Sequence, residues 1–182
     1  MERPNADEYV PYYDRYISLV TEDDVLALAR DQVEEVRRFA AAIPRELEEH
    51  RYAPGKWSVR EVFGHLIDVE RVHAYRAFAI ARGETKDLPG FEPDDFAAES
   101  GAGAVALRDL VEELVQERLS NVSFLARLSP RAWRRIGTAD GKRISVRALA
   151  YILPGHIKHH LRLLRELYGV GEAGNPGAGA PR

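Results

Sequence analysis

The chain of 182 residues contains no cysteine. This absence excludes disulfides, thiolate metal ligands and a cysteine nucleophile, so a bound metal would need histidine, aspartate, glutamate or water as ligands. No apolar run approaches the ~18–20 residues of a membrane span, and the acidic, polar N-terminus is not typical of a secretory signal. We therefore expect a cytoplasmic protein that does not enter a membrane.

Concentrated positive charge is also missing. The net charge is −3 at pH 7, and the arginines alternate with acidic residues instead of forming a basic patch. Nucleic-acid-binding proteins normally carry such a patch, so we expect no nucleic acid as a partner. With 45% hydrophobic residues the chain is globular, and its length fits one domain with a sizeable core.

Apolar residues recur every three or four positions in four long segments, which is the period of amphipathic helices. A T-x-x-D capping box at Thr21 and Asp24 precedes the first helix, and an S-V-R-E box at Ser58 opens the second. Four such helices predict an all-α protein, most economically a four-helix bundle. The predicted helices cover about residues 24–43, 58–82, 104–128 and 145–168.

The connections between these helices differ in kind. Residues 83–103 form a long loop with four glycines, which allows the second and third helices to run parallel through a crossover. Asp140-Gly141 predicts the turn of a small hairpin before the last helix. We place one domain at residues 1–168. Residues 169–182 carry a single large apolar side chain, Val170, and are expected to be a disordered tail.

Three histidines occupy positions where the helical pattern calls for apolar side chains. His156 and His160 lie four residues apart in the stripe that runs from Val146 to Leu167, so both imidazoles point to one side of the helix. His65 lies on the corresponding stripe of the second helix. That stripe ends at Arg76. Burying three imidazoles is costly unless their nitrogens are satisfied. A divalent metal would satisfy them, and three protein ligands with an open position are typical of a catalytic site.

Other polar residues near these stripes have less certain roles. His159 lies about 100° away from His156 and His160 around the helix, so we expect it near solvent or beside the ligands. His73 is two turns beyond His65, and we favour a rim position for it over a place in the cavity. Asp68 is a candidate to hold the free N–H of His65, with a solvated position equally favoured.

The best-known helical metal motifs do not fit. Glu70 and His73 form one E-x-x-H half-motif, but a di-iron bundle needs a second copy, and Leu153 stands where that glutamate would be. Ile157 also rules out the zincin pattern H-E-x-x-H. Pro154-Gly155 directly precedes His156, and we interpret this pair as a kink that turns His156 toward a cavity.

Two function classes remain open from the residues. A mononuclear site of three histidines, holding zinc, nickel or iron, would activate water or a thiol for attack on a small-molecule substrate. The alternative is a non-catalytic helical bundle in which the metal is structural and the protein acts as a binding or assembly module. A fourth protein ligand, for example Glu70 or His73, would favour the alternative.

Two strings in the chain resemble the DinB/YfiT-like family of four-helix metalloproteins. One is KWSVREVFGHLID, residues 56–68, and the other is ISVRAL, residues 144–149, leading into GHIKHH, residues 155–160. The combination is specific, because the histidines fall in the right order on the predicted helices. The resemblance covers about residues 8–170. One departure is Ile157-Lys158, where relatives often carry a Glu-Arg pair.

The resemblance implies up-down-down-up topology with a long crossover between the second and third helices. It implies one divalent metal held by His65, His156 and His160, and a homodimer. Family members are described as metal-dependent hydrolases or as S-transferases that use bacterial low-molecular-weight thiols. On this basis we expect a small-molecule substrate, with such a thiol as a second reactant.

Overall fold

The computed structural model describes residues 2–171. Its two short strands, β1 (Ile136–Ala139) and β2 (Lys142–Ser145), form an antiparallel hairpin, and the remaining elements of the described part are helices and turns. The helices are α1 (Asp14–Ile17), α2 (Val25–Ala41), α3 (Val59–Arg82), α4 (Pro93–Glu99), α5 (Leu107–Leu125), α6 (Pro130–Trp133) and α7 (Val146–Tyr168).

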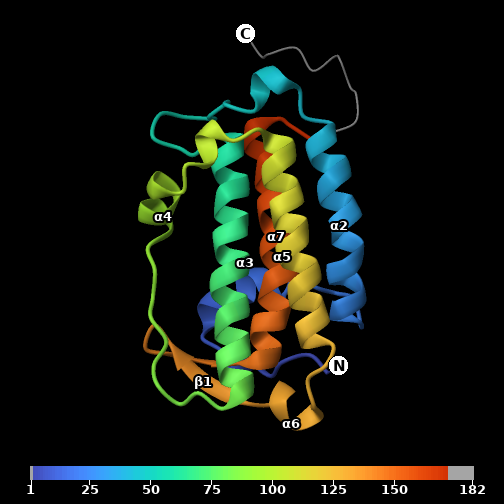
Figure 1. The fold of residues 1–182 in the computed structure, drawn as a ribbon, viewed down its shortest axis with the longest axis vertical. Helices are drawn as coiled ribbons and strands as arrows, with labels where there is room; N and C mark the ends of the chain where they lie inside the picture. The colour runs from blue at the N-terminus through green and yellow to red at the C-terminus, as the bar shows by residue number, and fades with distance from the viewer. Residues whose placement is uncertain (1, 172–182) are drawn as a thin grey trace.

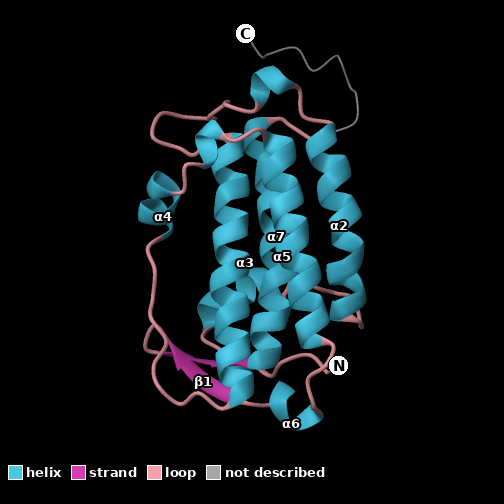
Figure 2. Ribbon diagram, in the orientation of Figure 1, coloured by secondary structure: helices cyan, strands magenta, loops and turns pink. Residues whose placement is uncertain are grey.

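Four long helices, α2, α3, α5 and α7, form the bundle (Figure 1). In Figure 1, α2 and α7 run from the bottom of the view to the top, whereas α3 and α5 run from top to bottom. This is the expected up-down-down-up topology, and the long crossover joins the two parallel helices. Figure 2 places the hairpin at the end of the bundle where α7 begins.

The crossover has more structure than the predicted loop. It contains α4 and a single 3-10 turn at Ala102–Ala104, which precede α5. Close packing explains the sequence here, because a Cβ added at Gly64 on α3 would collide with the Cβ of Ala102. The crossover therefore packs along α3 and forms part of the wall around the site.

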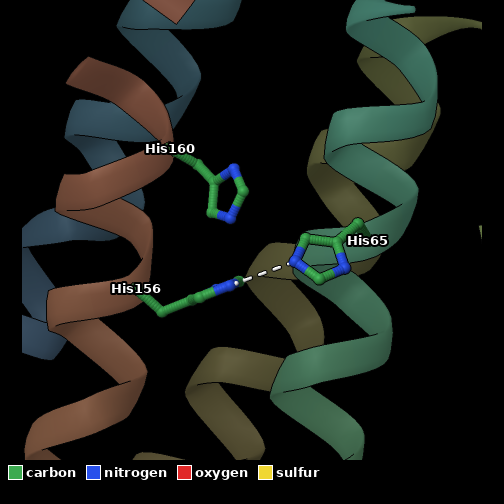
Figure 3. Close-up of side chains that lie close together, drawn as sticks. All are labelled: His65, His156 and His160. Carbon is green, nitrogen blue, oxygen red and sulfur yellow. Dashed lines mark hydrogen bonds between the residues drawn. The ribbon is translucent and has the colours of Figure 1, made fainter. Parts of the chain in front are cut away.

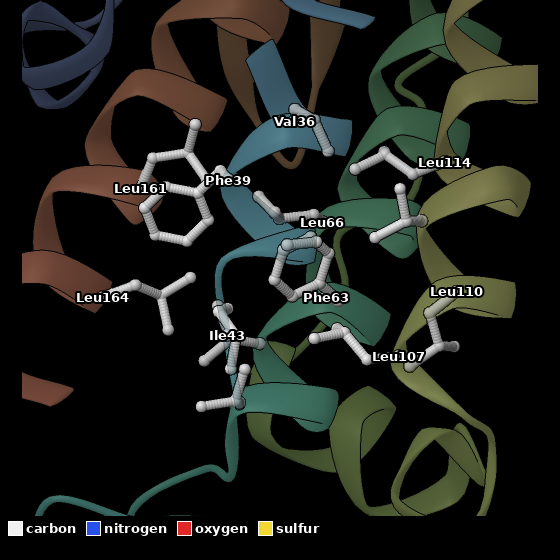
Figure 4. Packing of buried hydrophobic residues seen from close by; sticks show 14 of the residues in the cluster. Val36, Phe39, Ile43, Phe63, Leu66, Leu107, Leu110, Leu114, Leu161 and Leu164 are labelled. Atoms are coloured by element: carbon white, nitrogen blue, oxygen red, sulfur yellow. The ribbon is translucent and has the colours of Figure 1, made fainter. Parts of the chain in front are cut away.

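Buried apolar side chains from all four long helices make the core. Figure 4 shows one of two clusters, in which Phe63 and Leu66 of α3 meet residues of α2, α5 and α7. The second cluster fills the hairpin end, where Ile80 of α3 packs with Leu149 and Ile152 of α7. Together they account for the apolar stripes that the sequence displays on each helix.

Helix ends confirm one capping prediction and correct another. The box at Ser58 forms as predicted, because its side chain accepts from the N–H of Glu61 and its own N–H donates to the Glu61 carboxylate. At the first helix the cap is Asp24, whose carboxylate accepts from the N–H groups of Leu26 and Ala27 at 3.0 and 3.1 Å. Thr21 lies outside the helix, since Asp24 alone satisfies these free donors.

The end of the domain also needs a correction. Gly169 ends α7 in the left-handed conformation, with φ of 64°. Val170 then folds back into the core with 2% of its surface exposed. The domain therefore extends past residue 168, because the left-handed turn directs this one apolar side chain inward. Residues 172–182 of the expected tail lie outside the described part.

Candidate metal centre

Two helices bring the three predicted histidines together. His65 projects from α3, and His156 and His160 project from successive turns of α7. One nitrogen of each ring lies within 4.8 Å of the other two, and the rings point toward one another between the helices (Figure 3). Among the residues that the structure describes, this is the one cluster of histidine or acidic side chains that could hold a metal ion.

Neighbouring aromatic rings fix the orientation of these imidazoles. Trp57, just before the cap of α3, lies 4.6 Å from the ring of His65, measured between centroids. Tyr16 of α1 meets the ring of His156 edge-on at 5.1 Å. Such contacts restrict rotation of the rings, so the nitrogens are held near one point before any ligand arrives.

The Pro154-Gly155 pair lies inside α7 and makes close contacts with α1 and α2. Helix α7 continues through Pro154 as a single helix, and the Pro154 carbonyl accepts a hydrogen bond from Gln32 Nε2 at 3.1 Å. A Cβ at Gly155 would collide with the backbone carbonyl of Tyr16. Glycine is needed here because the chain at α1 crosses α7 at close range, which brings Tyr16 against His156.

The environment of the cluster keeps its imidazoles neutral. Burial lowers the pKa of His65 to about 4. Burial also holds the pKa values of His156 and His160 well below the ordinary value, and the adjacent imidazoles lower them further. His65 Nε2 and His156 Nε2 lie 3.1 Å apart, so one carries a proton and the other offers a lone pair. Neutral imidazoles that share a focal point are the donor set that a transition metal needs.

Neither carboxylate near His65 in sequence holds its ring. Glu61 caps Ser58 and also accepts a hydrogen bond from Arg51 Nη2 at 2.8 Å. Asp68 is half-buried, with burial raising its pKa, and no hydrogen bond joins it to His65 within the described chain. The expectation that Asp68 orients His65 therefore gains no support.

His73 lies deeper than the favoured rim position. It is buried, and its Nδ1 lies 3.1 Å from the Val69 carbonyl, which can only accept. Nδ1 therefore carries the proton, and Nε2, which has no partner among the described residues, keeps a lone pair. His159 is half-buried, 5.2 Å from the ring of His160, and lies outside the group of three.

A buried polar network beside the site was not foreseen. Arg118 of α5 donates to both carboxylate oxygens of Glu70, at 2.9 and 2.8 Å, and to the Leu153 carbonyl of α7 at 3.2 Å. It also donates to Gln32 Oε1 at 3.0 Å, so the network reaches the Pro154 carbonyl. In the sequence this network is indicated only by one polar residue at an inward position in each of α2, α3 and α5: Gln32, Glu70 and Arg118. This network occupies Glu70, which therefore cannot serve as a fourth ligand.

The three histidines open onto a cavity of about 480 Å³. Its walls come from α1 and the turn before it, from α3, the crossover, the hairpin and α7. The aromatic part of these walls consists of Tyr12, Tyr13, Tyr16, Trp57 and Phe91. His73, Arg76, His159 and the exposed pair Asp140 and Lys142 provide the polar part. A cavity of this kind beside clustered imidazoles has the form of a small-molecule site.

None of the helices in the described part is long and apolar enough to cross a membrane. The sequence model of the DinB superfamily matches residues 27–164. A search of curated proteins finds no match.

Two solved structures share the fold. The first, titled "YfiT from Bacillus subtilis is a probable metal-dependent hydrolase with an unusual four-helix bundle topology", has a TM-score of 0.72 at 15% identity and covers 91% of each chain. The second is the mycothiol-dependent maleylpyruvate isomerase, with a TM-score of 0.61 at 16% identity, covering 80% of this chain and 60% of that one. The matched sequence spans the bundle and all three clustered histidines, and the chain belongs to the DinB superfamily.

Proposed function

We propose that this protein is a mononuclear metal-dependent enzyme that binds one divalent transition metal, zinc, nickel or iron, through His65, His156 and His160. The observation that carries the proposal is the convergence of three neutral imidazoles on the wall of a cavity. Imidazole nitrogens suit these metals better than magnesium or calcium, which prefer oxygen.

The surroundings of the cluster support an open coordination position. Glu70 is committed to Arg118, and His73 is not among the residues whose nitrogens converge. A metal with three protein ligands keeps room for a reactant, which favours the enzyme over a purely structural role.

We propose that the nucleophile comes from outside the chain. The chain has no cysteine, and no serine or threonine lines the described walls of the cavity. A divalent ion held by three neutral ligands supplies a Lewis acid that makes water or a thiol a stronger nucleophile. We therefore propose hydrolysis by water or transfer to a low-molecular-weight thiol. Of the two relatives, one is described as a probable metal-dependent hydrolase and the other as a mycothiol-dependent isomerase.

The chain's own residues bind and orient the reactants. The aromatic rings of Tyr13, Tyr16 and Trp57 offer apolar surface that displaces water from a small organic substrate. The close contact of Tyr16 with His156 fixes the wall relative to the ligand cluster. We further propose a cytoplasmic homodimer, as the resemblance and the cysteine-free composition suggested.

An activity screen on metal-loaded protein tests this proposal. The chain is loaded with zinc, nickel or iron in turn and assayed for thiol transfer to an electrophilic aryl chloride and for hydrolysis of a nitrophenyl ester. Activity is expected with at least one metal, and it should disappear in the double variant His156→Ala/His160→Ala. A correctly folded double variant with undiminished activity would refute the proposal. Stoichiometric metal without exchangeable water would favour the non-catalytic bundle.

A further inference from the structure

One buried charged side chain in the cavity wall has no carboxylate of the described residues within ion-pair distance. Arg76 of α3 is 3% exposed and ends the inward stripe that begins with Val62 and His65. Its Nη2 donates to the Pro89 carbonyl at 2.6 Å, and its Nε has no partner among the described residues. The ring of Phe91 lies 5.8 Å from the guanidinium carbon. A carbonyl and an aromatic face reduce the cost of burying this cation, but neither neutralises it.

The other buried arginines show how this chain usually treats such a charge. Arg118 is bound by both oxygens of Glu70, and Arg147 donates through Nε to Glu8 Oε2 at 2.6 Å. Arg76 is the one buried arginine of the described chain without a carboxylate within ion-pair distance. Because an unpaired buried charge is expensive, its retention at a cavity wall indicates that a ligand supplies the missing anion.

The neighbouring polar groups do not supply it. Asp140, which lines the same cavity, is exposed and forms an ion pair with Lys142. Glu92 also borders the cavity, but it is exposed and forms no ion pair with Arg76. His73, one turn before Arg76, presents a lone pair at Nε2 and so cannot donate to an anion there. Arg76 is therefore the buried cation available to an anion in this part of the cavity.

We infer that Arg76 forms a subsite for an anionic group of the substrate, a carboxylate or a phosphate, in the same cavity as the three histidines. This inference rests on the proposed function only in treating the bound anion as part of a substrate, because anion binding by Arg76 needs no metal. A guanidinium binds such oxyanions through paired hydrogen bonds.

The position of Arg76 also limits the shape of the substrate. It follows His65 by 11 residues on a continuous helix, which separates the two Cα atoms by about 16 Å along the axis. The helical lean is the same for both side chains, so it leaves this separation largely unchanged. The substrate therefore carries its anionic group several bonds away from the reacting atom, with an apolar body against the aromatic walls.

A binding experiment with paired probes tests the subsite. 3-Phenylpropanoate, phenyl phosphate and the neutral 3-phenylpropanamide are titrated into the full chain by calorimetry, both as metal-loaded and as chelator-treated protein. We expect the wild type to prefer at least one anion over the amide by about tenfold or more. Arg76→Gln should abolish this preference. Arg82→Gln removes the same charge from an exposed position at the end of the same helix, outside the cavity lining, and should preserve it.

Two readouts separate this inference from the proposed function. Metal content and melting temperature are measured for each variant, and Arg76→Lys, which keeps the charge, should retain part of the preference if Arg76→Gln folds poorly. Equal affinity for anion and amide in the wild type would overturn the inference. An anion preference that needs the metal and survives Arg76→Gln would overturn it as well, while leaving the metal site intact. If the wild type shows the Arg76-dependent preference but takes up none of the metals offered to it, the subsite would be supported and the proposed function refuted.

Discussion

Position around the α7 helix decides which imidazole can join the cluster. His159 and His160 are adjacent, but only the nitrogens of His160 lie within 4.8 Å of those of His65 and His156. We predict that His160→Ala loses bound metal and that His159→Ala retains it. Elemental analysis after desalting measures both variants under the same conditions. The reverse result would mean that the helical register of the ligands is wrong by one residue.

Protonation of His73 should couple stability to pH. Burial lowers its pKa from 6.5 to about 3 in the folded chain. Above pH 6.5 the ring is neutral in both states. As the pH falls below 6.5, the unfolded chain takes up a proton that the folded chain does not, so stability is lost until the pH reaches about 3. This group alone costs about 2 kcal/mol between pH 6.5 and 5.

The variant His73→Phe isolates this effect, because a phenyl ring can keep the edge-on contact with Tyr13. Urea unfolding at pH 7 and pH 5, with a chelator present in both cases, gives the free energy of unfolding. The loss between the two pH values should be smaller in the variant than in the wild type. Identical losses in the two proteins would show that His73 titrates normally.

The positions of single side chains could be predicted from the sequence only where the helical period of apolar residues indicates that they are buried. His65, His156 and His160 could be found because each replaces an apolar residue on an inward stripe. The depth of His73 and the pairing of Glu70 with Arg118 depend on which helix lies opposite, and the contacting residues are far apart in the chain. No local pattern records such contacts, so these side chains were misplaced or missed.

At the scale of elements, the crossing of α1 over α7 sets one wall of the site. Alanine at a helical glycine normally stabilises by about 1 kcal/mol. At Gly155 the added Cβ would instead collide with the Tyr16 backbone, so we predict that Gly155→Ala destabilises by about 1–3 kcal/mol. Because Tyr16 contacts His156, metal affinity should fall too.

Gly103→Ala is a matched control for this prediction. An added Cβ at Gly103 would lie 3.7 Å from Glu61 Oε1, an ordinary contact, and the stability should change by less than about 0.5 kcal/mol. Chemical denaturation of both variants makes the comparison. Equal stability of Gly155→Ala and the wild type would show that α1 moves away freely.

Elements with strong periodicity were predictable, and those defined by packing were not. The four long helices and the hairpin turn at Asp140-Gly141 follow from apolar spacing, caps and turn residues. Helix α4 is only seven residues long, too short for a clear apolar period. It forms within the crossover that packs along α3, and such tertiary support is invisible in a short window of sequence.

For the molecule as a whole, the position of the C-terminal boundary of the domain can be tested by its effect on the free energy of unfolding. Val170 is buried, and its N–H donates to the Leu164 carbonyl at 3.3 Å. Truncation after Tyr168 removes both and should lower the free energy of unfolding by about 1–2 kcal/mol. Truncation after Gly171 should leave stability unchanged, because residues 172–182 contain no large apolar side chain. Equal melting temperatures for the two truncations would contradict this boundary.

The global topology could be anticipated from one connection. A crossover of about twenty residues between the second and third helices permits parallel neighbours, and the DinB-like motifs implied the same order of helices. The close packing of the N-terminal segment on α7 depends on a single glycine, Gly155. It could not be anticipated, because one glycine in a helix does not indicate which segment packs against it. Tyr13 and Tyr16 enter the cavity by that route, so part of the wall beside the histidines comes from the N-terminal segment.

The proposed function requires a metal ion whose protein ligands come from two helices alone. The most direct measurement is the metal content of the purified chain, combined with X-ray absorption at the metal edge, for the wild type and for His156→Ala/His160→Ala. We predict one divalent ion per wild-type chain, a first coordination sphere with three imidazole nitrogens, and loss of the ion in a double variant that remains folded. A stoichiometric ion in that variant, or an ion with four protein ligands in the wild type, would contradict the open three-histidine site.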